Sequence, residues 1–212
     1  MNFLTNLADE AVILPLTAGI GVMLLALGWR RGAIAWLVAV VSTLALMFVL
    51  KLLGFACGPS LLRAPSGHTA VAAVICGGLV AILARGERRL TLPIALLAAA
   101  VIGISRLALG AHSLPEVILG GAVGVGGAVL LARLAGRPPD RSRAAWVVGV
   151  VAVVLVIFHG ERLPAETRIH SLAYVMAQDL HICRGAPGWG WDQSDQERPY
   201  VSSSRTISSS PR

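Results

Sequence analysis

The sequence predicts an all-α, polytopic membrane protein built as a bundle of six transmembrane helices. Hydrophobic residues make up 56% of the chain and charged residues only 14%, whereas soluble domains carry about 25% charged residues. The apolar residues fall into six runs, most of them near the roughly 20 residues that a spanning helix needs. Because lipid offers the backbone no other hydrogen-bond partner, each run should be a helix.

The six apolar runs follow one another through short connections. Their bounds are 11–29, 33–57, 69–84, 90–110, 115–134 and 144–159. The third and sixth runs are short, so flanking turns must complete them. In the fifth run, Gly120 and Gly124 have the small-xxx-small spacing that lets two helices pack closely.

The runs organise residues 1–160 as one six-helix transmembrane domain. Residues 161–183 differ in character, because apolar residues there recur at near-helical spacing: Ile169, Leu172, Met176 and Leu180. This pattern predicts an amphipathic helix on the outer surface or against the bundle. Residues 184–212 are rich in Gly, Ser, Pro and Gln, and we expect a disordered tail.

Positive charge is distributed unequally between the two sides of the predicted bundle. The connections after the first, third and fifth runs hold nine arginines: Arg30, Arg31, Arg85, Arg88, Arg89, Arg133, Arg137, Arg141 and Arg143. Three tryptophans lie near the same ends, as in an aromatic belt: Trp29, Trp36 and Trp146. The positive-inside rule places these ends in the cytoplasm and both termini outside. Topology and anionic lipid therefore explain the net charge of +7 better than nucleic acid does.

Simple alternation of the runs brings several reactive residues to the outer side. Pro65-Ser66-Gly67-His68 opens the third run, where Pro65 suits a first helical turn and Gly67 allows a ligand close to the backbone. The unpaired N–H groups of a helix start favour an anion. His68 would stand at the same place, able to give a proton to a leaving oxygen.

A second stretch reads Ser105-Arg106, five residues, His112, three residues, Glu116. An arginine offers a planar fork for phosphate oxygens. A carboxylate behind a histidine holds the imidazole in the tautomer that can attack. Together with Lys51, the only lysine, these residues indicate a phosphate site at the outer face.

Each of these residues also has a plainer interpretation. Lys51 could extend its ammonium to the membrane interface, and Arg106 could merely flank a helix end. Glu116 could close a capping box with Ser113, which is compatible with a catalytic role. His68 alone could be an ordinary residue at a helix start. These interpretations require all four residues to meet on one face by accident.

The motifs resemble those of the type 2 phosphatidic acid phosphatase superfamily. Its pattern is Lys-x6-Arg-Pro, then Pro-Ser-Gly-His, then Ser-Arg-x5-His-x3-Asp, and the resemblance extends from Lys51 to Glu116. Two departures matter. Gly58 stands where the family has an arginine, and Arg63 could supply the missing cation from the same loop. Glu116 replaces the aspartate, which keeps the carboxylate and adds a methylene.

The resemblance implies a phosphohistidine mechanism without a metal ion or other cofactor. His112 would attack phosphorus, held by Glu116, and His68 would protonate the leaving group. These three form the expected catalytic set. The expected phosphate-binding set is Lys51, Ser66, Gly67, Arg106 and Arg63.

The resemblance further implies a lipid phosphate or diphosphate as substrate. Candidates are undecaprenyl diphosphate, phosphatidate, phosphatidylglycerol phosphate and lipid A phosphate. We expect the protein in the bacterial inner membrane with its site facing the periplasm or exterior, and no nucleic-acid partner. Two alternatives stay open: a phosphotransferase that passes the group to another lipid or sugar, and a non-catalytic protein that binds or transports lipid phosphates.

Overall fold

The computed structural model describes residues 10–57, 64–83, 88–136, 143–158, 169 and 171–172, all within the unit Met1–Ile182. Regular structure in these residues is helical throughout, with one short 3-10 turn at Arg88–Leu90. The α-helices are α2 (Glu10–Ala26), α3 (Arg30–Cys57), α4 (Gly67–Leu83), α5 (Thr91–Ala108), α6 (Leu114–Leu134) and α7 (Arg143–Phe158). The all-α prediction is confirmed for the described part of the chain.

Three of the helices are long and apolar enough to cross a membrane. They are α3, through Arg30–Phe55, with α5 and α6. The other three are apolar but shorter: Val12–Ala26, Gly67–Leu83 and Ala145–Phe158. The described residues therefore have the character of a membrane protein, and a bundle of six complete spans stays a prediction.

The first helix ends three residues before the predicted end of its apolar run. The N–H of Gly28 donates to Leu25 O and the N–H of Trp29 donates to Leu24 O, each at 2.9 Å. Gly28 has a φ of +74°, which completes a Schellman motif. Glycine thus ends α2 at Ala26 and turns the chain into α3.

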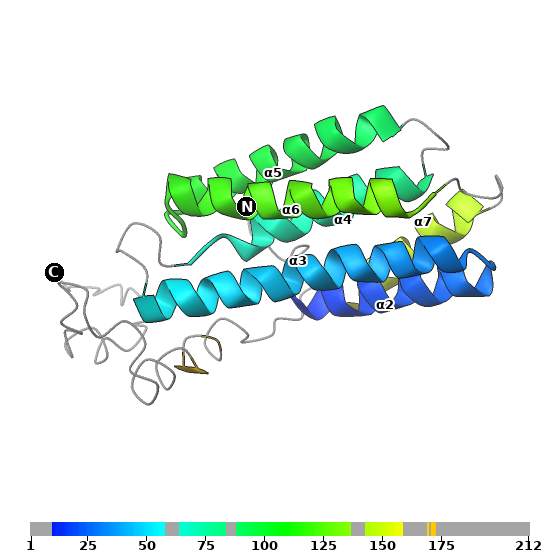
Figure 1. The fold of residues 1–212 in the computed structure, drawn as a ribbon, viewed down its shortest axis with the longest axis horizontal. Coiled ribbons are helices and arrows are strands. Elements are labelled where there is room, and N and C mark those ends of the chain that lie inside the picture. Colours follow the sequence, from blue (N-terminus) through cyan, green and yellow to red (C-terminus); the bar gives the residue numbers. More distant parts are fainter. Residues whose placement is uncertain are drawn as a thin grey trace, which may run out of the picture. The chain divides into compact units, whose positions relative to one another are not determined.

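Helix α4 contacts α3, α5 and α6, and α2 contacts α3 and α7 (Figure 1). The interior between α2 and α3 contains Trp36, which is fully buried, and its indole N–H donates to Thr17 O at 3.0 Å. Trp29 is buried as well, whereas Trp146 is 64% exposed. The aromatic-belt prediction was therefore wrong for Trp29 and Trp36, which are both buried in the protein, and a carbonyl inside the protein satisfies the only donor of Trp36.

The start of α3 and the end of α6 meet at the arginine-rich end of the helices. Arg31 Nε donates to Leu134 O at 2.8 Å, a contact between residues 103 positions apart. This arginine satisfies one of the carbonyls that a helix leaves unpaired at its C-terminus.

The predicted surface helix at 161–183 and the predicted tail at 184–212 lie outside the described residues, apart from Ile169, Ser171 and Leu172. Those three residues are helical. The prediction for the rest of both segments stays a prediction.

Candidate active site

The Pro-Ser-Gly-His motif lies where a non-helical segment enters α4. Ser66 is the cap residue, because its carbonyl accepts the first helical hydrogen bond from the N–H of Ala70 at 3.2 Å. Gly67 is the first helical residue, so Pro65 lies just before the cap and not in the first turn as predicted. Pro65 and Ser66 are fully buried. The motif is therefore an internal part of the helix packing.

A tight connection between α5 and α6 carries His112. The N–H of Ala111 donates to Arg106 O at 3.1 Å, and Gly110 has a φ of +63°, a conformation that suits glycine. Ser113 then caps α6 in an extended conformation. His112 is thereby held between the last turn of one helix and the first turn of the next.

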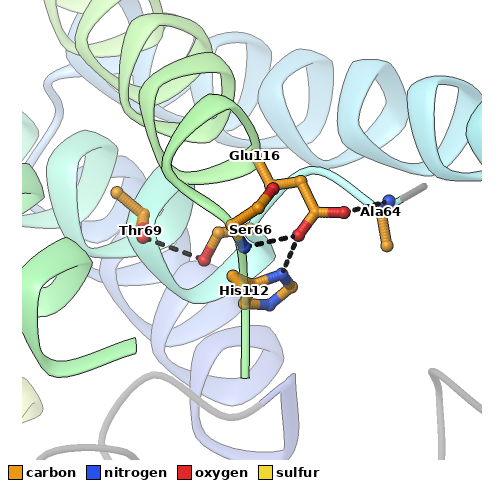
Figure 2. Close-up of polar contacts among 6 residues, drawn as sticks. Ala64, Ser66, Thr69, His112 and Glu116 are labelled. Carbon is orange, nitrogen blue, oxygen red and sulfur yellow. Dashed lines mark hydrogen bonds and ion pairs between the residues drawn. The ribbon is translucent and has the colours of Figure 1, made fainter. Parts of the chain in front are cut away.

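Glu116 joins His112 to the Pro-Ser-Gly-His motif (Figure 2). Its Oε2 lies 3.2 Å from His112 Nδ1 and accepts the N–H of Ser113 at 2.9 Å. Its Oε1 accepts the N–H of Ala64 at 2.9 Å. Its backbone carbonyl accepts the N–H of Ser66 at 3.0 Å. The contact with the Ser113 backbone and the contact with histidine are thus both made, and they use the same carboxylate oxygen.

The contact between Glu116 and His112 determines which ring nitrogen carries the proton. An ionised carboxylate only accepts hydrogen bonds, so we assign the shared proton to Nδ1. In the neutral ring, Nε2 then keeps its lone pair. That lone pair is what a nucleophilic histidine needs.

Lys51 reaches the motif from α3. The residue is only 7% exposed. A Cβ built on Gly67 would lie 3.6 Å from Lys51 Nζ, so the ammonium lies beside the start of α4. This burial favours a role in the site, because a lysine that extends to the membrane interface keeps its ammonium in water.

Arg106 lies in the last turn of α5 and is half-buried. Its Nε is buried and has no hydrogen-bond partner among the described residues. Leaving a buried donor unsatisfied costs about 1–3 kcal/mol, and more for a charged group. An anion bound here would remove that cost.

The remaining residues that the sequence singles out are His68, Gly58 and Arg63. His68 is half-buried in the first turn of α4. Gly58 and Arg63 lie outside the described residues. Within the described ranges, no three His, Cys, Asp or Glu side chains group closely enough to hold a metal ion.

Two contributors to the site were missed by sequence reasoning. The N–H of Ala64 binds the Glu116 carboxylate, and a backbone donor leaves no trace in the sequence. Thr69 is fully buried and donates from its hydroxyl to Ser66 Oγ at 2.9 Å. Its position three residues after the helix cap was a signal that could have identified it.

Gly120 and Gly124 pack α6 directly against the motif. A Cβ on Gly120 would overlap the backbone of Ser66, and a Cβ on Gly124 would overlap the backbone of Ala70. The spacing predicted close packing, and the structure identifies the start of α4 as the packing partner. These glycines therefore help to define the distance between Ser66 and the α6 backbone.

Comparison with known proteins agrees with the motifs. Residues 51–139 match the PAP2 superfamily. A Klebsiella pneumoniae protein, described as an uncharacterized 22.5 kDa protein in cps region, is 29% identical over 180 residues, which cover 78% of this chain and 86% of that protein. No solved structure matches the chain. The matched segment begins at Lys51 and contains the Pro-Ser-Gly-His motif, His112 and Glu116, so residues 51–139 are similar to the PAP2 superfamily.

Proposed function

We propose that the chain is a membrane phosphatase that hydrolyses a lipid phosphate or diphosphate through a phosphohistidine intermediate. The match of residues 51–139 to the PAP2 superfamily supports phosphatase activity on phosphate esters, and the apolar helices support a location in the membrane. The observation that carries the mechanism is the contact between Glu116 and His112 Nδ1, made by a residue whose backbone also binds Ser66.

In the first half-reaction, the lone pair of His112 Nε2 attacks phosphorus and forms an N–P bond. The P–O bond to the leaving group breaks, which is the lipid alkoxide for a monophosphate and the lipid monophosphate for a diphosphate, and His68 gives its proton to the departing oxygen. The imidazole of His112 gains positive charge as the bond forms. Glu116 stabilises that charge through Nδ1, as the carboxylate of a catalytic triad does.

In the second half-reaction, a water oxygen attacks the same phosphorus. The N–P bond breaks and its electron pair returns to Nε2 of His112. His68, now neutral, accepts a proton from the water. Inorganic phosphate leaves, and both histidines return to their starting protonation states.

Positive charge and N–H donors would stabilise the transferring phosphoryl group. The Lys51 ammonium beside Gly67 and the buried Arg106 Nε favour binding of non-bridging oxygens. The N-terminus of α4 adds further donors with a favourable dipole. Arg63 would add a cation in place of the arginine absent at Gly58.

The proposed substrate is a lipid because the site lies at the ends of apolar helices. Long apolar side chains near the site are exposed and suit contact with acyl or prenyl chains: Leu53, Leu109, Leu114 and Ile118. With the arginine-rich connections in the cytoplasm, the site would face the periplasm or exterior. That side suits recycling of undecaprenyl diphosphate, and phosphatidate is a simpler substrate of the same chemistry.

The test is phosphate release by purified full-length protein from undecaprenyl diphosphate and from phosphatidate. We expect His112→Ala to lower kcat by roughly 10³-fold or more, because it removes the nucleophile. His170→Ala changes a histidine that is not among the proposed site residues, so it is the matched control and should keep wild-type activity. When turnover is stopped by rapid quenching, radiolabelled phosphate from the substrate should be found on the wild-type protein and not on His112→Ala.

Three outcomes would contradict parts of this proposal. Equal phosphate release by the wild type and His112→Ala would rule out the phosphohistidine mechanism. Transfer of the label to an added lipid or sugar in preference to water would indicate the phosphotransferase. Binding of lipid phosphates without release would indicate the non-catalytic alternative.

A further inference from the structure

We propose that Thr69 is a positioning residue that directs the Ser66 hydroxyl proton toward a bound phosphate. The inference deepens the proposed function and rests on it for the identity of the ligand. It starts from the hydrogen bond that Thr69 Oγ1 donates to Ser66 Oγ at 2.9 Å, between two side chains that are both 0% exposed.

The hydrogen bonds of Ser66 leave only its hydroxyl hydrogen without an assigned acceptor. Its backbone N–H donates to Glu116 O at 3.0 Å and its carbonyl accepts from Ala70 at 3.2 Å. Its Oγ lies 2.9 Å from Thr69 Oγ1, and we assign the shared proton to Thr69. A hydroxyl has one donor and two acceptor positions, so with this assignment the Ser66 proton points away from Thr69. In a buried site that proton needs an acceptor.

The same contact leaves the start of α4 available to an anion. A serine at a helix cap ordinarily uses its Oγ to accept a backbone N–H of the first turn. Among the described residues, Ser66 Oγ pairs instead with the Thr69 hydroxyl. Ser66 therefore works as a donor at the helix start, beside the Lys51 ammonium, which lies next to Gly67.

The orientation of Thr69 is determined by packing on its other branch. Its Cγ2 lies 3.8 Å from a Cβ built on Gly103 of α5 and 3.7 Å from one built on Gly121 of α6. A β-branched side chain has few χ1 choices in a helix. With the methyl held between α5 and α6, the hydroxyl is directed to Ser66.

The packing and hydroxyl roles of Thr69 predict opposite rankings for two variants. Thr69→Val keeps a group in the place of Cγ2 and removes the hydroxyl, whereas Thr69→Ser keeps the hydroxyl and removes the methyl. If the hydroxyl positions Ser66, Thr69→Val should lower kcat/KM about 10-fold, the size expected from one lost hydrogen bond. Thr69→Ser should then fall between wild type and Thr69→Val. If Thr69 contributes only through packing, Thr69→Ser should have the lower kcat/KM of the two variants.

A double-mutant cycle with Ser66→Ala isolates the pathway through the serine. Loss of one transition-state donor is expected to lower the turnover rate about 10²-fold. If Thr69 acts through that donor, the double variant should lose no more than Ser66→Ala alone. Thr17→Val removes another buried threonine hydroxyl, one that donates to Ile13 O at 2.7 Å in α2, and should leave kcat/KM unchanged.

A binding measurement separates this inference from the catalytic proposal. We would titrate inorganic phosphate into purified wild-type protein and into Thr69→Val, following competition with substrate and, independently, thermal stabilisation of the protein. Weaker phosphate binding by Thr69→Val supports the inference even if the wild type releases no phosphate, an outcome that counts only against the catalytic proposal. Equal phosphate affinity in both proteins, or additive losses in the double-mutant cycle, would overturn it.

Discussion

At the scale of single residues, Glu116 connects the two motifs of the proposed site. Its two carboxylate oxygens serve three donors, at His112, Ser113 and Ala64, and its carbonyl holds Ser66. Glutamate is one methylene longer than the aspartate of the family pattern. The longer side chain lets one carboxylate contact the histidine on one side and the backbone before α4 on the other.

The first prediction at this scale concerns the length of that side chain. Glu116→Asp restores the family residue but draws the carboxylate back by about 1.5 Å, roughly one C–C bond. We expect it to lose either the Ala64 or the His112 contact and to lower kcat about 10-fold, with a smaller effect on KM. Steady-state phosphate release measures both parameters.

Glu116→Gln provides the matched comparison, because it keeps the length and removes the charge. An amide cannot accept from all three donors, so we expect a greater loss of kcat than in Glu116→Asp. Wild-type or higher activity in Glu116→Asp would show that the extra methylene is not needed to hold His112 in position.

At the scale of elements, the contact between α4 and α6 decides the geometry of the site. Gly120 and Gly124 let the α6 backbone approach the first turn of α4 without intervening side chains. This close approach permits the hydrogen bond from Ser66 N–H to Glu116 O. The helix interface and the proposed catalytic site therefore share the same backbone atoms.

A prediction at this scale follows from the space at each glycine of α6. Gly120→Ala would place a Cβ into the backbone of Ser66, so α4 and α6 must separate. We expect a loss of about 1–3 kcal/mol in the free energy of unfolding, the usual cost of overpacking. Because the site geometry shifts with the helices, turnover should also fall, by roughly 10-fold or more. Thermal unfolding in detergent and phosphate release measure the two effects.

Gly126→Ala is the control on the same helix. A Cβ there meets nothing within 4 Å, so the substitution should keep activity and stabilise the helix by about 0.5–1 kcal/mol. Unchanged stability and activity in Gly120→Ala would contradict the packing described between Gly120 and Ser66.

At the scale of the whole molecule, the helices carry different chemistry at their two ends. One end holds the contact between Arg31 and Leu134, and the other holds Lys51 beside Gly67. Lys51 follows Arg30 by 21 positions on the continuous helix α3, a rise of about 30 Å, which equals the thickness of the hydrocarbon core. A membrane with these arginines on one side would place the proposed phosphate site on the other.

This separation predicts the topology. A periplasm-dependent alkaline phosphatase reporter fused after Gly160 should be active, because the sixth apolar run returns the chain to the outer side. The same reporter fused after Pro139, within an arginine-rich connection, should be inactive. The reverse pattern would place the site in the cytoplasm and remove the argument for carrier recycling, without affecting the phosphatase chemistry.

The sequence by itself determined the helices and which reactive side chains they carry. Apolar runs must be helical in lipid, and the predicted run at 115–134 lies within one residue of α6. The contact between His112 and Glu116 could also be predicted from the sequence, because residues four positions apart meet at a helix start. Short-range spacing was sufficient for both.

Only the tertiary structure decided how these parts meet. The contact between Ala64 and Glu116 joins residues 52 positions apart, and it forms because α4 and α6 dock through glycine. Burial of Trp36, and the packing that orients Thr69, depend in the same way on helices distant in the chain. Periodicity specifies which residues share a face of one helix, but the partner of that face is selected by the packing of all the helices together.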